Sequence, residues 1–280
     1  MTISLILPVY NVSKYLDRCL EAICSQAPYL NMIEIIMVDD CSKDNSTSII
    51  KLWANKYSNF KIVTHQINKG LGAARNTGLK YASGDYIWFI DTDDYVSYSS
   101  LSRIFEVLIH SSPDVLKFNF LKENNQHKLI NENLNPDFKI FNISGYEYLV
   151  NYYQPASMSA CSNVYKRKYL LEKGLFFQEG VFWEDADVVL KSYLLADDFY
   201  YMPENLYYYC YNQSSISRNL SSKKIIDLLK MAVRKNELMY LIPNEELRRK
   251  VLLDVIWNLN AIKKIILLDF NDLIIFFIVI

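Results

Sequence analysis

Three carboxylates directly follow an apolar run near the end of the first hundred residues. The run covers 84–90 (Gly-Asp-Tyr-Ile-Trp-Phe-Ile), and Asp91, Asp93 and Asp94 come next. A continuous apolar run after a Gly-Asp turn predicts a strand that is buried on both faces. Because strand side chains alternate, we expect Asp91 and Asp93 on one side and Thr92 on the other. Two carboxylates at a strand end suit Mn²⁺ or Mg²⁺, which also binds substrate phosphates, although an isolated Asp-x-Asp is often only a solvated turn.

A second group of acidic residues lies in the other half of the chain. Glu184 and Asp185 stand in the run 182–187 (Phe-Trp-Glu-Asp-Ala-Asp), directly before an apolar helical pattern. Such carboxylates are candidates for general acid–base chemistry. Acidic residues also stabilise a helix N-terminus, so structural capping is the alternative. The three scattered histidines offer little material for a zinc site or a histidine-based triad.

The composition is that of an ordinary globular protein. The 280 residues are 51% hydrophobic and 22% charged, enough for one large domain, or a domain with an appendage, around a sizeable core. The net charge is −1, so nucleic acid is not expected as a partner. Five cysteines without metal-type spacing indicate thiols in a reducing compartment. The first residues enter a strand without a basic and apolar leader, which favours a cytoplasmic protein.

The elements that must position these carboxylates alternate between strand and helix. The predicted strands are 3–9, 33–38, 61–65 and 84–90, and the predicted helices include 16–23, 49–53 and 70–82. This alternation predicts right-handed crossovers and a Rossmann-like α/β fold, with a mainly parallel sheet flanked by helices. In such sheets ligands bind beyond the carboxyl ends of the strands, where the Asp91–Asp94 cluster falls.

One motif in this region partly matches a dinucleotide-binding fingerprint. Gly70 and Gly72 fit its first two glycines, but Arg75 stands where the fingerprint has glycine or alanine, and the motif does not follow the first strand. We therefore do not expect a dehydrogenase. The glycines are better explained by a turn and a close approach, with Arg75 placed to meet an anion or a base edge.

Beyond residue 97 the pattern is less regular. A strand is expected at 115–121, a polar hairpin or loop at 122–142, and a tyrosine-dense strand pair or strand-loop at 199–211. From Ser221 the chain is helical, amphipathic and basic, and the apolar end 273–280 is too short to span a bilayer. These helices fit either a membrane interface or partner groove, or a pair that covers the main domain.

Four segments in this order and spacing carry a resemblance to a known family. They are Leu-Pro-Val-Tyr-Asn (7–11), Val-Asp-Asp-Cys-Ser-Lys-Asp (38–44), Asn-Lys-Gly-Leu-Gly-Ala-Ala-Arg-Asn-Thr-Gly (68–78) and Phe-Ile-Asp-Thr-Asp-Asp (89–94). Together they resemble the nucleotide-sugar half of family 2 glycosyltransferases, which have the GT-A fold. Residues 183–185 (Trp-Glu-Asp) resemble the acceptor half of bacterial polysaccharide members.

The resemblance implies a domain organisation and a set of roles. Residues 1–218 form the GT-A domain, with a nucleotide-sugar half (1–97) and an acceptor half (98–218). The resemblance does not extend to 219–280, where the amphipathic pattern predicts a helical extension that is a candidate for membrane association. The implied nucleotide-sugar residues are Pro8, Tyr10, Asp40, Arg75, Asp91 and Thr92. Among them, Pro8 and Tyr10 line the base pocket, and Asp40 accepts from the uracil imide. Asp93 holds Mn²⁺ or Mg²⁺, and Asp185 is the catalytic base, with Glu184 as its rival.

The implied reaction is an inverting, metal-dependent transfer of a hexose from a UDP-sugar to a sugar acceptor. The expected acceptor is a saccharide on a polyprenyl diphosphate, in O-antigen or capsule synthesis, with peripheral contact to the inner face of the plasma membrane. A sugar-nucleotide-synthesising nucleotidyltransferase is an alternative, but it should carry a Gly-rich basic loop where this chain has Pro-Val-Tyr-Asn (8–11). A non-catalytic sugar-binding protein would explain the tyrosines and leave the clustered aspartates unexplained.

Overall fold

The computed structural model describes residues 1–124, 126, 128–130, 141–155, 158–212 and 222–269. The strands are β1 (Ile3–Val9), β2 (Ile33–Asp39), β3 (Phe60–Thr64), β4 (Tyr86–Phe89), β5 (Tyr95–Val96), β6 (Val115–Glu123), β7 (Leu129–Ile130), β8 (Phe141–Ile143), β9 (Asn163–Lys166) and β10 (Phe199–Tyr209). The α-helices are α1 (Leu16–Cys24), α2 (Ser46–Lys56), α3 (Leu71–Tyr81), α4 (Ser100–Ser111), α5 (Gly145–Tyr152), α6 (Arg167–Glu172), α7 (Ala186–Leu194), α8 (Ser222–Glu237) and α9 (Glu245–Asp269). Short 3₁₀ segments cover Ala27–Met32, Ala160–Ser162 and Leu238–Leu241.

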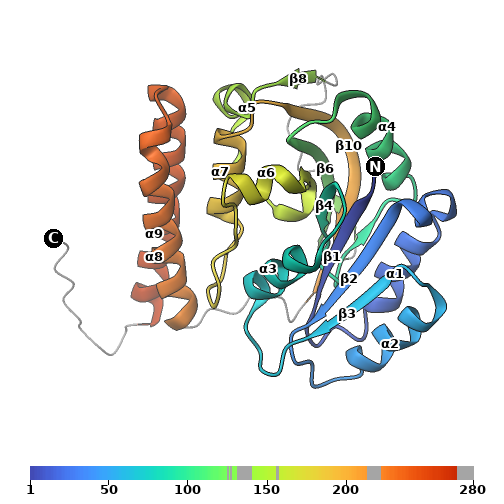
Figure 1. Cartoon of the computed structure of the whole chain (residues 1–280). Helices are drawn as coiled ribbons and strands as arrows, with labels where there is room; N and C mark the ends of the chain where they lie inside the picture. Colours follow the sequence, from blue (N-terminus) through green and yellow to red (C-terminus); the bar gives the residue numbers. More distant parts are fainter. Residues whose placement is uncertain (125, 127, 131–140, 156–157, 213–221, 270–280) are drawn as a thin grey trace.

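All of these strands belong to one curled sheet (Figure 1). Its order is β3-β2-β1-β4-β9-β6-β10-β5, with β7 beside β6 and β8 beside β10. β1 to β4 are mutually parallel, and so are β6 and β10, whereas β9 is antiparallel to both of its neighbours and β5 is antiparallel to β10. The predicted α/β fold is confirmed, and β9 is the strand that reverses direction and joins the two halves.

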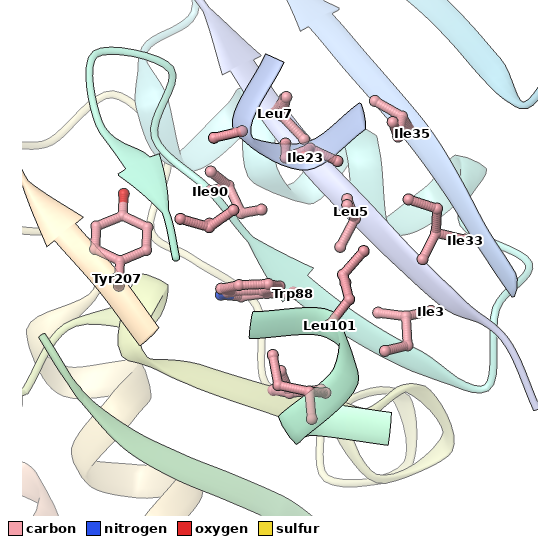
Figure 2. Packing of buried hydrophobic residues seen from close by; sticks show 14 of the residues in the cluster. Ile3, Leu5, Leu7, Ile23, Ile33, Ile35, Trp88, Ile90, Leu101 and Tyr207 are labelled. Atoms are coloured by element: carbon pink, nitrogen blue, oxygen red, sulfur yellow. The ribbon is translucent and has the colours of Figure 1, made fainter. Parts of the chain in front are cut away.

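Helices cover both faces of the parallel part, which explains why its strands are apolar almost throughout. Every residue of β1 is buried. Ile3, Leu5 and Leu7 point to one face and pack with Ile23 of α1 and Leu101 of α4 (Figure 2). The alternate residues point to the other face, towards α3. A strand with both faces covered must be apolar at successive positions, as the sequence of β1 is apart from Ser4.

The tyrosine-dense segment forms one long strand, β10, and not a strand pair. Along most of its length it pairs in parallel with β6. The hairpin expected in 122–142 is present where the structure describes it, since β6 and β7 pair antiparallel at Lys122↔Ile130 and Glu123↔Leu129. Residues 125, 127 and 131–140 lie outside the described part of the chain.

The C-terminal helices α8 and α9 lie side by side beyond α5 and α7 (Figure 1). A buried ion pair joins them, with Lys235 Nζ 2.7 Å from Asp254 Oδ2, and the Tyr153 hydroxyl donates to the same carboxylate. The inner faces of the pair therefore cover the main domain, as one of the two interpretations predicts. The outer faces expose Ile226, Val233 and Trp257. The predicted boundary at 218–219 and the apolar end 273–280 lie outside the described residues.

Within the described helices, none combines the length and the apolar composition that a membrane crossing requires.

Candidate active site

The guanidinium of Arg75 is the centre of a buried cluster of charges. Arg75 lies on α3 and is 1% exposed. Its Nη1 donates to Glu184 Oε1 at 2.5 Å, and its Nη2 donates to Asp91 Oδ1 at 2.8 Å. The Phe177 ring covers the guanidinium, with Cζ 5.1 Å from the ring centroid. One arginine thus connects the carboxylates after β4 with the acidic pair before α7.

One donor of the Arg75 guanidinium has no acceptor among the described residues. Its Nε is buried and has no hydrogen-bond partner among the described residues. Buried donors nearly always find an acceptor, from the protein, from water or from a ligand. The anion that sequence analysis expected at Arg75 is thus, in this structure, a pair of protein carboxylates, with a further donor left for another acceptor.

The aspartates after β4 lie in a turn. The strand ends at Phe89, and the Asp94 N–H donates to the Asp91 carbonyl at 3.1 Å. Strand alternation was therefore the wrong reason for grouping Asp91 with Asp93. Burial raises the pKa of Asp93, and the charge of Asp91 adds to the rise. The two carboxylates therefore still interact.

Polar groups from distant parts of the chain fix this turn. The Thr92 hydroxyl donates to the Pro8 carbonyl at 2.6 Å, which ties the turn to the end of β1. Asp94 is 2% exposed and accepts from the Tyr207 hydroxyl at 2.6 Å and from Cys210 N–H at 2.7 Å. Burial raises the pKa of Asp94 well above its usual range, with the Asp93 charge adding to the rise. Asp94 is therefore a structural residue of the turn.

Glu184 and Asp185 lie beside Arg75 but differ in their surroundings. Glu184 is 5% exposed and is held by Arg75. Asp185 is half-buried and accepts from Ala160 N–H at 3.2 Å. Burial raises the pKa of both carboxyl groups, and the Arg75 guanidinium opposes the rise. Glu184 forms the ion pair with Arg75, and among the described contacts Asp185 forms none with it.

The residue directly before this pair is strained. Trp183 adopts φ +56°, in the left-handed region that bulky side chains rarely occupy. A left-handed residue of this kind costs about 1–2 kcal/mol and persists only when its surroundings hold it. Backbone outliers often lie at functional sites, and this one is next to Glu184 and Asp185.

A second buried site organises the loop before α3. Asp40 follows β2 and accepts from the backbone N–H groups of Lys69 and Gly70, each at 2.8 Å. His65 Nδ1 lies 2.6 Å from the same carboxylate, and the other ring nitrogen lies 2.9 Å from the Thr77 hydroxyl. Asp40 thus draws the start of α3 towards the end of β2.

The glycines of this loop have the roles that the sequence suggested. Gly70 has φ +89°, which ordinary side chains avoid, and turns the chain into α3. A Cβ atom on Gly72 would lie 2.3 Å from the Gln178 carbonyl oxygen. Glycine therefore lets α3 approach the segment that leads to Glu184, and Arg75 reaches that carboxylate from the same helix.

Comparison with known proteins identifies the family of this chain. The profile described as Glycosyl transferase family 2 matches residues 4–174. The chain belongs to glycosyltransferase family 2. The glycosyltransferase GlyA of Streptococcus pneumoniae is 33% identical over 228 residues, which are 79% of this chain and 32% of GlyA. This family 2 chain thus spans about a third of the length of that relative.

Solved structures show the same fold. The structure of S. aureus TarS 1–349 in complex with UDP-GlcNAc has a TM-score of 0.76 and 22% identity, over 93% of this chain and 73% of that one. The mannosyltransferase PcManGT from Pyrobaculum calidifontis, in complex with GDP-Man and Mn²⁺, has a TM-score of 0.62 and 17% identity, over 94% and 75% of the two chains. At these identities the likeness establishes the GT-A fold of the family 2 domain.

The structure brings some of the predicted site residues together and leaves others apart from the charge cluster. Arg75 contacts both Asp91 and Glu184. The charge of Asp91 acts on Asp93, and the charge of Arg75 acts on Asp185. A further group lies at the ends of β1 and β2. In that group Pro8 and Thr92 are joined by their hydrogen bond, Tyr10 is 46% exposed, and Asp40 holds the loop before α3.

Several residues of the family 2 site carried no signal in the sequence that would have identified them. Asn212 donates to Asp93 Oδ2 at 3.0 Å, and Arg18 donates to the Asp93 carbonyl at 2.9 Å. Tyr207 accepts from Asp91 N–H at 3.2 Å as well as donating to Asp94. They come from α1, from β10 and from the residues after it. Only the density of tyrosine in 199–211 drew attention to that region.

The carboxylates after β4 fit a divalent cation in their donor chemistry. Among the described residues no three histidine, cysteine, aspartate or glutamate side chains gather as a metal site. A magnesium or manganese ion bound together with a nucleotide needs only one or two carboxylates, because water and phosphate complete its shell. The raised pKa of Asp93, from burial and from Asp91, marks a place where a positive charge would be favourable.

Proposed function

We propose that this family 2 domain transfers a hexose from a UDP-sugar to a sugar acceptor with inversion at the anomeric carbon. The observation that carries the proposal is the pair of contacts from Arg75 to Asp91 and Glu184. They join the segment resembling the donor site to the acidic pair resembling the acceptor site. The TarS structures with UDP-GlcNAc and UDP add support for a uridine nucleotide.

Asp185 is our candidate for the catalytic base. The attacking hydroxyl must lose a proton, and a carboxylate facing the sugar opposite the leaving group can accept it. Glu184 remains the rival, but its carboxylate is committed to Arg75 at 2.5 Å. The burial that raises the pKa of Asp185 makes this carboxylate a stronger base than an exposed aspartate.

On the donor side, we assign the divalent cation to Asp93. A Mn²⁺ or Mg²⁺ ion bound there would neutralise the negative charge that develops on the departing diphosphate. Arg75 holds the carboxylate of Asp91, which we propose for the ribose, and the buried Nε of Arg75 can serve a further acceptor. Pro8, Tyr10 and Asp40 are proposed for the uracil, and Thr92 supports the site through its bond to Pro8.

For the acceptor we propose a saccharide on a polyprenyl diphosphate, as in O-antigen or capsule synthesis. The exposed apolar side chains on α8 and α9 include Ile226, Val233, Leu253 and Trp257. Two lysines, Lys223 and Lys230, lie along the same side of α8 with more than half of each side chain exposed. An apolar helix face with basic residues and tryptophan suits the surface of an anionic bilayer. The protein would then work at the inner face of the plasma membrane.

The test is release of UDP from a panel of UDP-sugars, with Mn²⁺ or with EDTA, alongside the affinity for UDP. Wild type should release UDP from one favoured donor in the presence of metal. Asp93→Ala should lose both that release and the metal-dependent part of UDP binding, and the exposed Asp197→Ala should behave like wild type. Absence of both release and metal-dependent UDP binding in wild type would overturn the proposal.

The base is tested separately. Asp185→Asn should bind UDP normally and lose at least tenfold in turnover, because a positioned general base contributes about 10²–10⁴-fold. Turnover near that of wild type in Asp185→Asn, with loss in Glu184→Gln, would move the role to Glu184.

A further inference from the structure

The helix α8 contacts the segment that carries the acidic pair. Asp227 Oδ2 accepts from the backbone N–H of Phe182 at 3.2 Å. Lys223 Nζ donates to the Gly180 carbonyl at 2.7 Å and to Asp227 at 2.9 Å. Arg234 Nε lies 3.1 Å from Asp187 Oδ2. One face of α8 therefore binds the chain on both sides of Glu184 and Asp185.

The acidic partners in these contacts are largely buried, whereas the Lys223 side chain is 59% exposed and its bond to the Gly180 carbonyl lies at the surface. The Asp227 side chain is 2% exposed, and the side chains of Arg234 and Asp187 are 17% and 13% exposed. Burial works against ionisation of Asp227, but hydrogen bonds from Lys223 and from Phe182 N–H outweigh it and lower the pKa of this carboxyl. Asp227 is thus a charged acceptor for the Phe182 amide, the stronger kind of hydrogen bond.

The strained residue lies against the same helix. Trp183 and Ala186 pack on Leu228 and Met231 of α8. The left-handed backbone at Trp183 needs surroundings that hold it in place. Asp227 accepts from the N–H of Phe182, the residue directly before Trp183, and the Trp183 side chain packs on Leu228 and Met231. The helix therefore supplies both a polar and an apolar restraint on this residue.

The opposite side of the segment is fixed by α3. Asn76 donates to the Phe177 carbonyl at 2.8 Å and accepts from Phe177 N–H at 2.9 Å. Residues 177–187 are therefore restrained at one end by the helix that carries Arg75 and at the other end by α8. The C-terminal helix completes a support that the family 2 profile, which ends at residue 174, does not include.

We propose that α8 is a positioning element of the active site, in which Asp227 and Arg234 hold the strained turn at Trp183 so that Glu184 and Asp185 face the acceptor. This inference rests on the proposed function for the role of the acidic pair. It assigns to the C-terminal helices a task in catalysis beyond covering the domain or contacting a membrane.

The experiment compares Asp227→Ala, Asp227→Asn and the matched control Glu237→Ala, which removes an exposed carboxylate from the same helix. Three quantities are measured: UDP affinity, UDP release from the favoured UDP-sugar with water as acceptor, and hydrogen exchange in 180–187. Asp227→Ala should lower kcat at least tenfold, leave UDP affinity within twofold, and raise exchange in 180–187. Asp227→Asn, which can still accept from Phe182 N–H, should keep most of kcat, and Glu237→Ala should match wild type.

The outcomes separate this inference from the proposed function. If wild type showed neither UDP release nor metal-dependent UDP binding, the proposed function would fail, and the exchange of 180–187 in Asp227→Ala would still show whether α8 restrains the segment. Faster exchange there with unchanged kcat would overturn the positioning role. Loss of UDP affinity in parallel with kcat would also overturn it, because it would indicate general unfolding. Arg234→Met, which leaves the Phe182 contact intact, should show a smaller fall in kcat in the same direction.

Discussion

Arg75 and Glu184 are 109 positions apart in the chain and form a hydrogen-bonded ion pair of 2.5 Å, with the two side chains 2% and 6% exposed. A contact of this kind cannot form until α3 and the segment before α7 have both reached their final places. This ion pair therefore reports on the assembly of the two halves of the site. Asp91 contacts the same guanidinium, so the turn after β4 belongs to the same assembly.

We expect Arg75→Met to be strongly destabilising, because it leaves Glu184 and Asp91 without their buried cation. Breaking a buried ion pair by removing one partner costs about 3–5 kcal/mol. The double variant Arg75→Met, Glu184→Gln should recover about 0.5–3 kcal/mol of that loss, the usual coupling for residues in contact. Urea denaturation of the four proteins of this cycle gives the coupling energy.

The control for that cycle is the half-exposed pair Arg103–Glu204. Arg103→Met should cost about 0–1 kcal/mol, as surface ion pairs do. Equal losses for Arg75→Met and Arg103→Met would contradict the central role of Arg75.

Replacing Gly72 should separate α3 from the segment that leads to Glu184. In Gly72→Ala the new Cβ would lie 2.3 Å from the Gln178 carbonyl oxygen, so one of the two backbones must move. We expect a loss of about 1–3 kcal/mol in stability, as for overpacked cores, and a fall in UDP release. In the control Gly174→Ala nothing lies within 4 Å of the added Cβ, and only the φ of +59° opposes it. That variant should lose stability and keep its turnover per folded molecule.

The buried amine of Lys117 should make stability depend on pH. Lys117 on β6 is 1% exposed, and its Nζ donates to the Phe118 carbonyl at 2.9 Å and to the Ser162 hydroxyl at 2.8 Å. Burial lowers its pKa to about 7, whereas an unfolded chain would have a lysine pKa of about 10.4. Between these values the unfolded chain binds the proton and the folded chain does not. The free energy of unfolding should therefore rise with pH over this window, by at most about 1.4 kcal/mol per pH unit. This contribution of Lys117 should be lost as the pH falls towards 7.

The measurement is urea unfolding at pH 7, 8 and 9 for wild type and Lys117→Met. The rise with pH should be smaller in Lys117→Met, and it should be unchanged in Lys168→Met, whose lysine side chain is 76% exposed. Parallel pH profiles for wild type and Lys117→Met would show that the amine is already charged in the folded protein.

Removing the Tyr207 hydroxyl should loosen the turn that carries Asp91 and Asp93. Tyr207→Phe takes away the 2.6 Å bond to buried Asp94 and the acceptor of Asp91 N–H. A buried group left without its partner costs about 1–3 kcal/mol, so we expect a lower urea midpoint and weaker metal-dependent UDP binding. Tyr208→Phe is the matched control, because its ring can keep the stack on Tyr95 at 4.5 Å. An unchanged urea midpoint in Tyr207→Phe would show that the bond between Tyr207 and Asp94 does not fix the turn.

The sequence by itself determined the layered α/β architecture and most of its elements. Apolar runs such as 3–9 and 33–38 are local patterns, and strands buried on both faces must have them. The short motifs around Asp40, Arg75 and Asp91 also identified the family, because their order and spacing are properties of the chain alone. What these residues contact in space was not contained in those patterns.

Only the tertiary structure decided the partners of the charged groups. Arg75 was expected at an anion and meets the protein carboxylates Asp91 and Glu184, because β9 turns the second half of the chain back against the first. The contacts of Asp227 with Phe182 and of Asn212 with Asp93 likewise join residues 45 and 119 positions apart. Hydrogen bonds at such separations depend on how whole elements pack, and a local periodicity records only which face of each element is buried.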